Sequence, residues 1–153
     1  MLRVLFASIL AFGLDRLSKI IIVYGLDLIS LQTIPLWPPY LKFVMGWNKG
    51  VNFGLLSSFD VPWVLVTVTV VVSLALGLWA RNQSGWVLPL ASGTIIGGAF
   101  GNAYDRVMYG AVADYLNVSC CGINNPYSFN VADVLIFGGA AFLIAHNGQE
   151  GRR

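Results

Sequence analysis

The sequence predicts an all-α membrane protein with four transmembrane helices, and three observations carry this prediction. Apolar residues make up 57% of the 153 residues and charged residues only 10%, whereas soluble domains average about 25% charged residues. The mean hydropathy is +0.73. The apolar residues gather in stretches at about 4–24, 61–80, 86–104 and 131–146. Stretches of about 20 apolar residues suit the hydrocarbon core of a bilayer, and the length predicts a single domain over 1–153.

The first stretch is interrupted by charges, and two interpretations of it compete. It could be a signal peptide whose apolar core is Val4–Leu14, or a retained first helix. We favour the retained helix because Ile20–Tyr24 continues the apolar stretch and no Ala-x-Ala-like cleavage site follows the core. Asp15 and Lys19 lie four residues apart, in the order that favours an intrahelical ion pair. This pair either neutralises itself inside the bundle or supports a nearby site, and the two roles are compatible.

The second and third stretches predict helices joined by a short turn at 81–85. Val61–Ala80 holds twenty uncharged residues in sequence. The stretch 86–104 is instead rich in small residues, which let helix backbones approach closely in lipid. We therefore expect this helix at the centre of the bundle, packed through Ala91, Ser92, Gly93, Gly97, Gly98, Ala99 and Gly101.

The basic residues predict the orientation. Arg3, Arg81 and the Arg152–Arg153 tail fall on one side of the four stretches. Because basic residues favour the cytoplasmic side, both termini are expected in the cytoplasm. The connections 25–60 and 105–129 then lie outside, and the first of them holds a possible strand at Tyr40–Val44.

Several other kinds of chemistry are disfavoured. A net charge of +2 without a basic run does not suggest a nucleic-acid partner. The adjacent Cys120 and Cys121 are poorly placed for a structural disulfide, and with one distant histidine, His146, they make no zinc-site spacing. We therefore predict neither a metal nor another cofactor.

The acids near the outer membrane edge carry the functional signal, because ionisable groups at membrane spans are costly unless they are paired or face a site. Asp133 follows Asn130 by three residues at the start of the fourth stretch, which resembles a capping box with Asp in place of Glu. Asp114 is either an interfacial loop acid or a second site carboxyl. Two carboxyls sharing a partly dehydrated site can act as base and acid, because one pKa rises.

Five blocks of sequence, in order, make the chain resemble lipoprotein signal peptidase, also called signal peptidase II. Asp15 to Lys19 looks like the family's D-x-x-x-K, and Asn48 to Gly54 looks like its N-x-G-x-x-F segment. Gly101 to Arg106 matches G-N-x-x-D-R. Gly110 to Tyr115 is similar to G-x-V-V-D-F, and Phe129 to Asp133 matches F-N-x-A-D. Ala113 and Tyr115 depart conservatively from the pattern, whereas Leu116–Ser128 matches no motif.

The resemblance implies an aspartic endopeptidase of the bacterial cytoplasmic (inner) membrane, without a metal or a covalent intermediate. It would cut prolipoproteins just before their lipid-modified cysteine, and we expect it to work as a monomer among membrane lipids. Asp114 and Asp133 would be the catalytic pair. The resemblance also implies a small extracytoplasmic strand cradle and a short helix, and it assigns substrate-binding or supporting roles to Asn48, Gly50, Asn102, Arg106, Asn130, Asp15, Lys19 and Asp105.

Other functions fit the sequence less well. A presenilin-like protease needs a G-x-G-D motif, which is absent, and the only histidine lies at the wrong end of the fourth stretch for a rhomboid-like serine protease. The main alternative is a small transporter or proton relay that uses the same aspartates. It predicts polar residues spread across the membrane depth, whereas here most lie at the outer edge. A non-catalytic scaffold would leave these costly acids unexplained.

Overall fold

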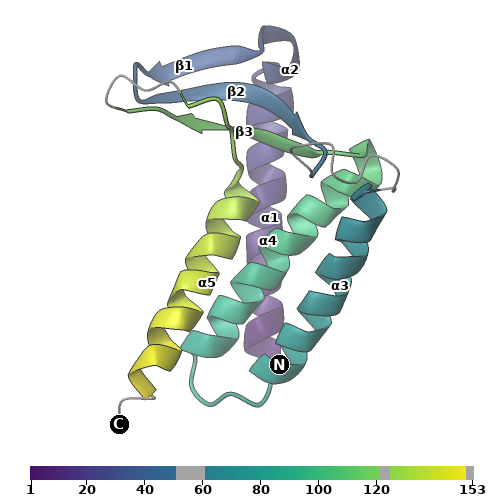
Figure 1. Cartoon of the computed structure of the whole chain (residues 1–153), viewed down its shortest axis with the longest axis vertical. Helices are drawn as coiled ribbons and strands as arrows, with labels where there is room; N and C mark the ends of the chain where they lie inside the picture. The colour runs from purple at the N-terminus through teal and green to yellow at the C-terminus, as the bar shows by residue number, and fades with distance from the viewer. Residues whose placement is uncertain (51–60, 121–124, 151–153) are drawn as a thin grey trace.

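A computed structural model describes residues 1–50, 61–120 and 125–150 of the chain. Within these residues, long helices stand beneath a three-stranded sheet (Figure 1). The long helices are α1 (Leu2–Lys19), which continues as the π-helical segment η1 (Ile20–Gly25), α3 (Val61–Ala80), α4 (Val87–Tyr109) and α5 (Val131–Glu150). The sheet consists of β1 (Thr33–Trp37), β2 (Leu41–Asn48) and β3 (Val112–Val118), and the short helix α2 (Leu28–Leu31) precedes β1.

Helix α4 lies at the centre, as its small residues predicted, and it packs against α1, α3 and α5. The contact with α1 depends on glycine. A Cβ atom at Gly93 would lie 2.4 Å from the carbonyl oxygen of Val4, and one at Gly97 would lie 2.2 Å from that of Ser8. These two positions exclude any side chain, so the backbones of α1 and α4 meet directly.

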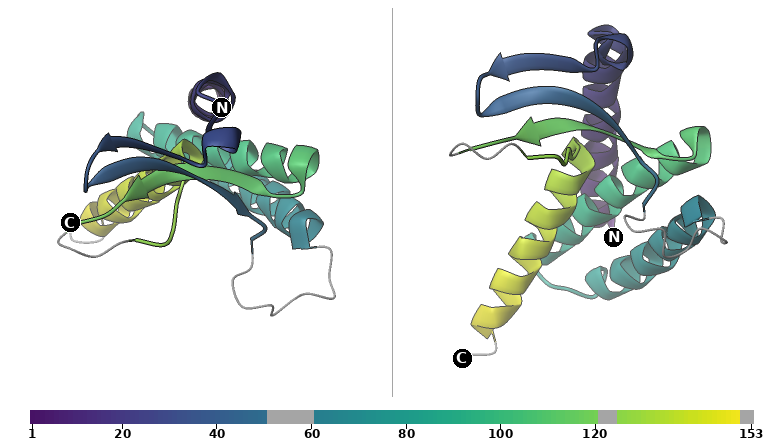
Figure 2. Two further views of the ribbon diagram at one scale, coloured as in Figure 1. Left: turned by 90° about the horizontal axis from the view of Figure 1, so that it is seen from above. Right: turned by 45° about the horizontal axis from the view of Figure 1, so that its top comes forward.

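The sheet is antiparallel in the order β1-β2-β3 and lies across one end of the bundle (Figure 2). The register of β2 and β3 shifts between Phe43 and Gly46, and beyond this irregularity Gly46 lies opposite Asp114. The implied strand cradle and short helix are thus present. Of the possible strand at Tyr40–Val44, Leu41–Val44 form the first half of β2, whereas Tyr40 lies in the preceding turn. The partner strand β1 was not predicted.

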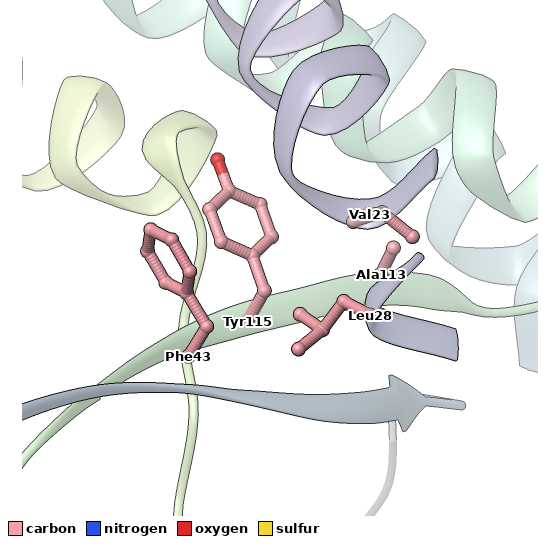
Figure 3. Packing of buried hydrophobic residues seen from close by; sticks show 5 residues of the cluster. All are labelled: Val23, Leu28, Phe43, Ala113 and Tyr115. Carbon is pink, nitrogen blue, oxygen red and sulfur yellow. The ribbon is translucent and has the colours of Figure 1, made fainter. Parts of the chain in front are cut away.

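A small apolar cluster fixes the sheet to the helices. It is formed by Val23, Leu28, Phe43, Ala113 and Tyr115, all with at most 9% of their surface exposed (Figure 3). Because the cluster joins η1, α2, β2 and β3, burying it holds β3 against the end of α1. This contact gives the strand that carries Asp114 a fixed position over the bundle.

One helix of the described residues, Pro62–Ala80, is long and apolar enough to cross a membrane by length and composition, and Val131–His146 forms a shorter apolar helix. Helices α1 and α4 carry charged residues near the end that meets the sheet. The four expected helices are therefore present, and their crossing of a membrane stays a prediction.

The boundary predicted after the third stretch was wrong. We placed Asp105 and Arg106 in the connection 105–129, but α4 continues to Tyr109 and ends at Gly110, whose φ of +71° suits a glycine cap. The uncharged stretch was a poor guide because Asp105 is neutralised by partners on α1, so its charge does not end the helix. Helix α5 likewise runs past 146 to Glu150.

Candidate functional site

The two candidate catalytic acids come from different elements at the sheet end of the bundle. Asp114 lies on β3 with 4% of its surface exposed, so it is no loop acid. Asp133 lies in the first turn of α5 and is half-buried. The acids are nineteen positions apart in sequence. Phe129, just before α5, pairs with Leu116 of β3 in an isolated antiparallel bridge, which brings the start of α5 close to β3.

Asparagine side chains connect the two acids. The Nδ2 of Asn130 donates to Asp114 Oδ1 at 2.6 Å and to Asn102 Oδ1 at 3.1 Å. The Nδ2 of Asn102 in turn donates to Asp133 Oδ1 at 2.9 Å. From β2, the Nδ2 of Asn48 donates to Asp114 Oδ2 at 3.0 Å. All three asparagines of the predicted site thus take part in one network around the acids.

The predicted capping box is confirmed at the start of α5. The backbone N–H of Asp133 donates to Asn130 Oδ1 at 2.9 Å, and the backbone N–H of Asn130 donates to Asp133 Oδ2 at 3.2 Å. These reciprocal bonds fix the Asp133 side chain at the helix N-terminus, where the helix dipole stabilises a negative charge. The capping role and a catalytic role are therefore compatible.

Asp114 has a different electrostatic environment. Burial and the nearby charge of Asp133 together raise the pKa of Asp114 to about 6, against hydrogen bonds from Asn48 and Asn130 that lower it. A carboxyl in this environment holds a proton at a pH where an exposed carboxyl has lost it. The surroundings of Asp114 thus favour a protonated carboxyl, whereas Asp133 lies at a helix N-terminus that favours a carboxylate. Acid–base catalysis by two carboxyls needs this contrast.

A buried ion-pair cluster lies directly beneath the acids. Lys19 Nζ lies 3.0 Å from Asp15 Oδ2 and 2.6 Å from Asp105 Oδ2. Arg16 Nη2 lies 2.9 Å from Asp15 Oδ2 and 2.7 Å from Asp105 Oδ1. Two acids and two bases make the cluster neutral, which lets it stay buried at an acceptable cost. The predicted pair of Asp15 and Lys19 is confirmed as one part of this larger cluster.

The acids of this cluster also hold the backbone next to each candidate catalytic acid. Asp105 Oδ2 accepts the N–H of Ala113 at 3.2 Å, one residue before Asp114. Asp15 Oδ1 accepts the N–H of Ala132 at 3.2 Å, one residue before Asp133. The ion-pair cluster thus fixes β3 and α5 relative to α1 and α4, and it does so next to Asp114 and Asp133.

Arg106 and Gly50 lie beside this network. Arg106 Nη1 donates to the carbonyl oxygen of Asn102 at 3.3 Å, and its buried Nε has no hydrogen-bond partner among the described residues. Gly50 has a φ of +90°, and its N–H donates to Asn48 Oδ1 at 2.8 Å. A Cβ atom at Gly50 would approach the Leu65 side chain to 2.3 Å, so conformation and space both favour glycine here.

A pocket of about 400 Å³ opens beside Asp114. One wall is the second half of β2 with the two residues that follow it, from Val44 to Gly50, and the other is the segment Pro126–Ser128. The side chain of Asn117, 1% exposed, holds this second wall by donating to the carbonyl oxygens of Asn125 and Tyr127, both at 2.9 Å. The described part of Leu116–Ser128, which no motif explained, therefore includes a strand end and a pocket wall.

Two residues of this region were missed by the sequence reasoning. Arg16 was left out of the D-x-x-x-K block, although two buried acids need a second cation beside Lys19 for neutrality. The first stretch alone carried no signal for Arg16, because its second partner, Asp105, lies on α4. Asn117 carried no signal, because an asparagine in an unmatched segment looks like any loop residue.

The remaining candidate residues lie elsewhere. His146 is near the far end of α5, away from Asp133. Cys120 is exposed just after β3, and Cys121 lies outside the described residues.

Comparison with known proteins identifies the family. The family model described as signal peptidase (SPase) II matches residues 7–147. A relative named lipoprotein signal peptidase from Methylorubrum extorquens (strain PA1) is 39% identical over 142 residues, covering 92% of this chain and 82% of the relative. One of the same name from Alteromonas mediterranea (strain DSM 17117 / CIP 110805 / LMG 28347 / Deep ecotype) is 37% identical over 148 residues, covering 94% and 79%.

Solved structures agree at the level of the fold. Two structures of a bacterial membrane enzyme, each 21% identical to this chain, match with TM-scores of 0.77 and 0.80. They cover 97% and 94% of this chain, and the match takes in 88% and 90% of the solved chains. The family model and the named relatives define a peptidase, and the solved structures agree with its fold. The chain belongs to the signal peptidase II family, as its five sequence blocks indicated.

Proposed function

We propose that this protein is an aspartic endopeptidase that removes the signal peptide from lipid-modified prolipoproteins, cutting just before the diacylglyceryl-cysteine. The observation that carries the proposal is the pair Asp114 and Asp133, joined through the amides of Asn130 and Asn102. Their contrasting surroundings suit an acid and a base, respectively. The names of the curated relatives support the substrate class.

The reaction begins with a water molecule between the two carboxyls. Asp133, ionised at the helix N-terminus, takes a proton from this water as its oxygen attacks the scissile carbonyl carbon. Asp114, protonated, first donates a hydrogen bond to the carbonyl oxygen. It then gives its proton to the leaving nitrogen of the lipid-modified cysteine as the C–N bond breaks. The signal peptide leaves with a carboxyl group and the lipoprotein with a free amine.

The supporting residues hold this pair and the substrate chain. Asn48 and Asn130 orient Asp114, whereas Asn102 orients Asp133. The guanidinium of Arg106 supports the site by donating to the carbonyl oxygen of Asn102. Gly50 lets the chain turn closely past this guanidinium. Asp15, Lys19 and Asp105 act through the backbone of β3 and α5.

The membrane setting follows from the same arrangement. The four long helices would cross the cytoplasmic membrane with both termini inside, so that the sheet and the acids lie at the outer face. A diacylglyceryl group keeps the scissile bond close to the membrane surface, and a catalyst for that bond must present its carboxyls at the same depth. The position of Asp114 and Asp133 at the sheet end of the helices supports this match.

The decisive experiment follows the mass of a lipidated prolipoprotein incubated with purified protein in detergent. The wild-type protein should release the signal peptide, whereas Asp114→Asn and Asp133→Asn should each lose at least about 10³-fold in rate because each loses a proton-transfer group. The control Asp27→Asn changes an exposed acid and should stay active. Cleavage that survives in either site variant would refute the pair, and a cleavage-inactive wild type would favour the proton relay.

A further inference from the structure

An apolar groove lies between α1 and α3 on the surface of α4. Both helices pack on α4 but have only sparse contacts with each other, so a space of about 370 Å³ stays open between them. Its lining is almost entirely apolar, and Leu5 and Leu74 are 54% and 62% exposed there. The lining residues include Val4, Leu5, Leu74, Gly77, Ile96 and Phe100.

This groove ends in a basic pocket at the end of the bundle opposite the sheet. The pocket has a volume of about 350 Å³, and Arg3, Arg81 and Gln83 line it. Met1 lines both spaces, and Ala80 in the pocket follows Gly77 in the groove by about one helical turn of α3. The apolar groove and the basic pocket therefore adjoin each other at Met1.

The guanidinium of Arg3 is held in place beside this pocket. Its Nη1 donates to the carbonyl oxygen of Gly85, and its Cζ lies 4.2 Å from the centre of the Trp86 ring. A guanidinium has five N–H donors, so further donors remain for a ligand. Within the described residues, the ion pairs join Asp15, Arg16, Lys19 and Asp105 only, which leaves the charges of Arg3 and Arg81 uncompensated there.

A second apolar groove on the bundle serves as a comparison. Between α4 and α5 lies a space of about 400 Å³, of similar size and similarly apolar. Its lining, from Val87 on α4 to Phe142 on α5, includes no charged residue. The lining of the first groove includes no charged residue either, and what distinguishes it among the described residues is the adjoining pocket lined by Arg3 and Arg81.

We propose that the α1–α3 groove and its basic pocket bind one anionic diacyl phospholipid. One acyl chain lies along the groove, and the phosphate lies between Arg3 and Arg81. Guanidinium groups form strong paired hydrogen bonds to phosphate, and basic pockets between transmembrane helices suit anionic headgroups. The lipid would join α1 to α3, which the protein itself barely connects. This proposal is independent of the peptidase activity.

The test titrates delipidated wild-type protein in detergent with dioleoyl phosphatidylglycerol and, separately, with dioleoyl phosphatidylcholine, and counts bound lipid by native mass spectrometry. We expect one phosphatidylglycerol to be retained, with an affinity about thirty-fold higher than that for phosphatidylcholine. Equal affinities would overturn the proposal, since the two lipids share their acyl chains and differ in headgroup charge. This comparison needs no variant.

Variants then test the two parts of the site. Arg3→Gln with Arg81→Gln should abolish the preference for phosphatidylglycerol, whereas the matched Arg3→Lys with Arg81→Lys should retain most of it. Gly77→Leu should fill the groove and prevent retention, because a Cβ there meets only the end of Ile96 at 3.8 Å. Gly138→Leu, in the α4–α5 groove, is the matched control and should change nothing.

Two results would overturn the assignment. Retention of the preference in the double glutamine variant would remove the arginines from the site. Displacement of the bound lipid by a lipidated prolipoprotein would assign the groove to the substrate.

Discussion

Asp114 and Asp133 are held by similar partners but in opposite electrostatic settings. Both accept hydrogen bonds from asparagine amides. Asp133 also accepts a backbone N–H at a helix N-terminus, which stabilises its charge, whereas Asp114 lies on a strand with 4% of its surface exposed. Burial disfavours the charged form of a carboxyl, so the two environments support the proposed roles of Asp114 as acid and Asp133 as base.

This division predicts a pH dependence. Burial raises the pKa of Asp114 to about 6, and the proposed mechanism requires the protonated form. We therefore expect kcat/KM to fall as the pH rises through about 6. Asn48→Ala removes a hydrogen bond that lowers this pKa, so the falling limb should move to higher pH. Steady-state kinetics between about pH 4 and 9 measure the limb.

The control for this profile is Asn82→Ala, a change in the turn after α3, far from the acids. It should leave the limb in place. A kcat/KM that rises through about pH 6 would instead make Asp114 the base, and a limb that Asn48→Ala does not move would mean that another group titrates.

At the scale of elements, the ion-pair cluster links helices and strands that are far apart in the sequence. Asp15 on α1 holds the start of α5, and Asp105 on α4 holds β3. Lys19 and Arg16 each contact both acids. The distance between the carboxyls of Asp114 and Asp133 therefore depends on this ion-pair cluster, which holds the backbone beside each of them.

Removing one charge should be worse than removing two. Lys19→Met leaves an unbalanced buried acid and should destabilise the protein by about 3–5 kcal/mol. Adding Asp105→Asn restores neutrality, and the asparagine oxygen can still accept the Ala113 N–H, so we expect part of the stability to return. Thermal unfolding in detergent measures both variants, with Lys42→Met on β2 as a control. Additive losses would contradict a coupled cluster.

The close contact between the backbones of α1 and α4 is a second feature at the scale of elements. Gly97→Ala would place a methyl group 2.2 Å from the Ser8 carbonyl oxygen and 2.8 Å from Ala11 Cβ. The helices must then separate, at a cost of about 1–3 kcal/mol. Because Asp15 lies one turn beyond Ala11, activity should fall together with the melting temperature.

Gly138→Ala is the matched control for this change, since a Cβ atom at Gly138 would meet nothing within 4 Å. It should keep both activity and melting temperature. A fully active Gly97→Ala protein with an unchanged melting temperature would show that α1 and α4 tolerate a wider spacing than their backbones have here.

At the scale of the whole molecule, the long helices lie on one side of the sheet, which caps one end of the bundle (Figure 1). The proposed topology predicts which residues meet water on each side. In a protein with Cys120→Ser and Cys121→Ser, a new cysteine at Lys42 on β2 should react with a membrane-impermeant maleimide added to intact cells. One at Ser84, between α3 and α4, should react only after the cells are broken. The opposite pattern would invert the protein in the membrane.

Much of this architecture follows from the sequence alone. Apolar stretches located the long helices, small residues located α4 at the centre, and helical spacing paired Asp15 with Lys19. Residues whose partners are distant could not be found in this way. β1 depends on its pairing with β2, Arg16 depends on Asp105, and the end of α4 depends on charges that α1 neutralises. A local sequence pattern cannot show a strand pairing or a charge neutralisation that forms only in the folded chain.

The order of the elements along the chain has a consequence for biosynthesis. Asp114 precedes α5, whereas Asp133 and its bridging Asn130 come with that helix, after every other element of the site. During synthesis, an inserted chain that still lacks α5 has one carboxyl and no partner for it. Under the proposed mechanism, the protein therefore becomes active only when α5 joins the other elements, so the order of its elements delays activity to the end of synthesis.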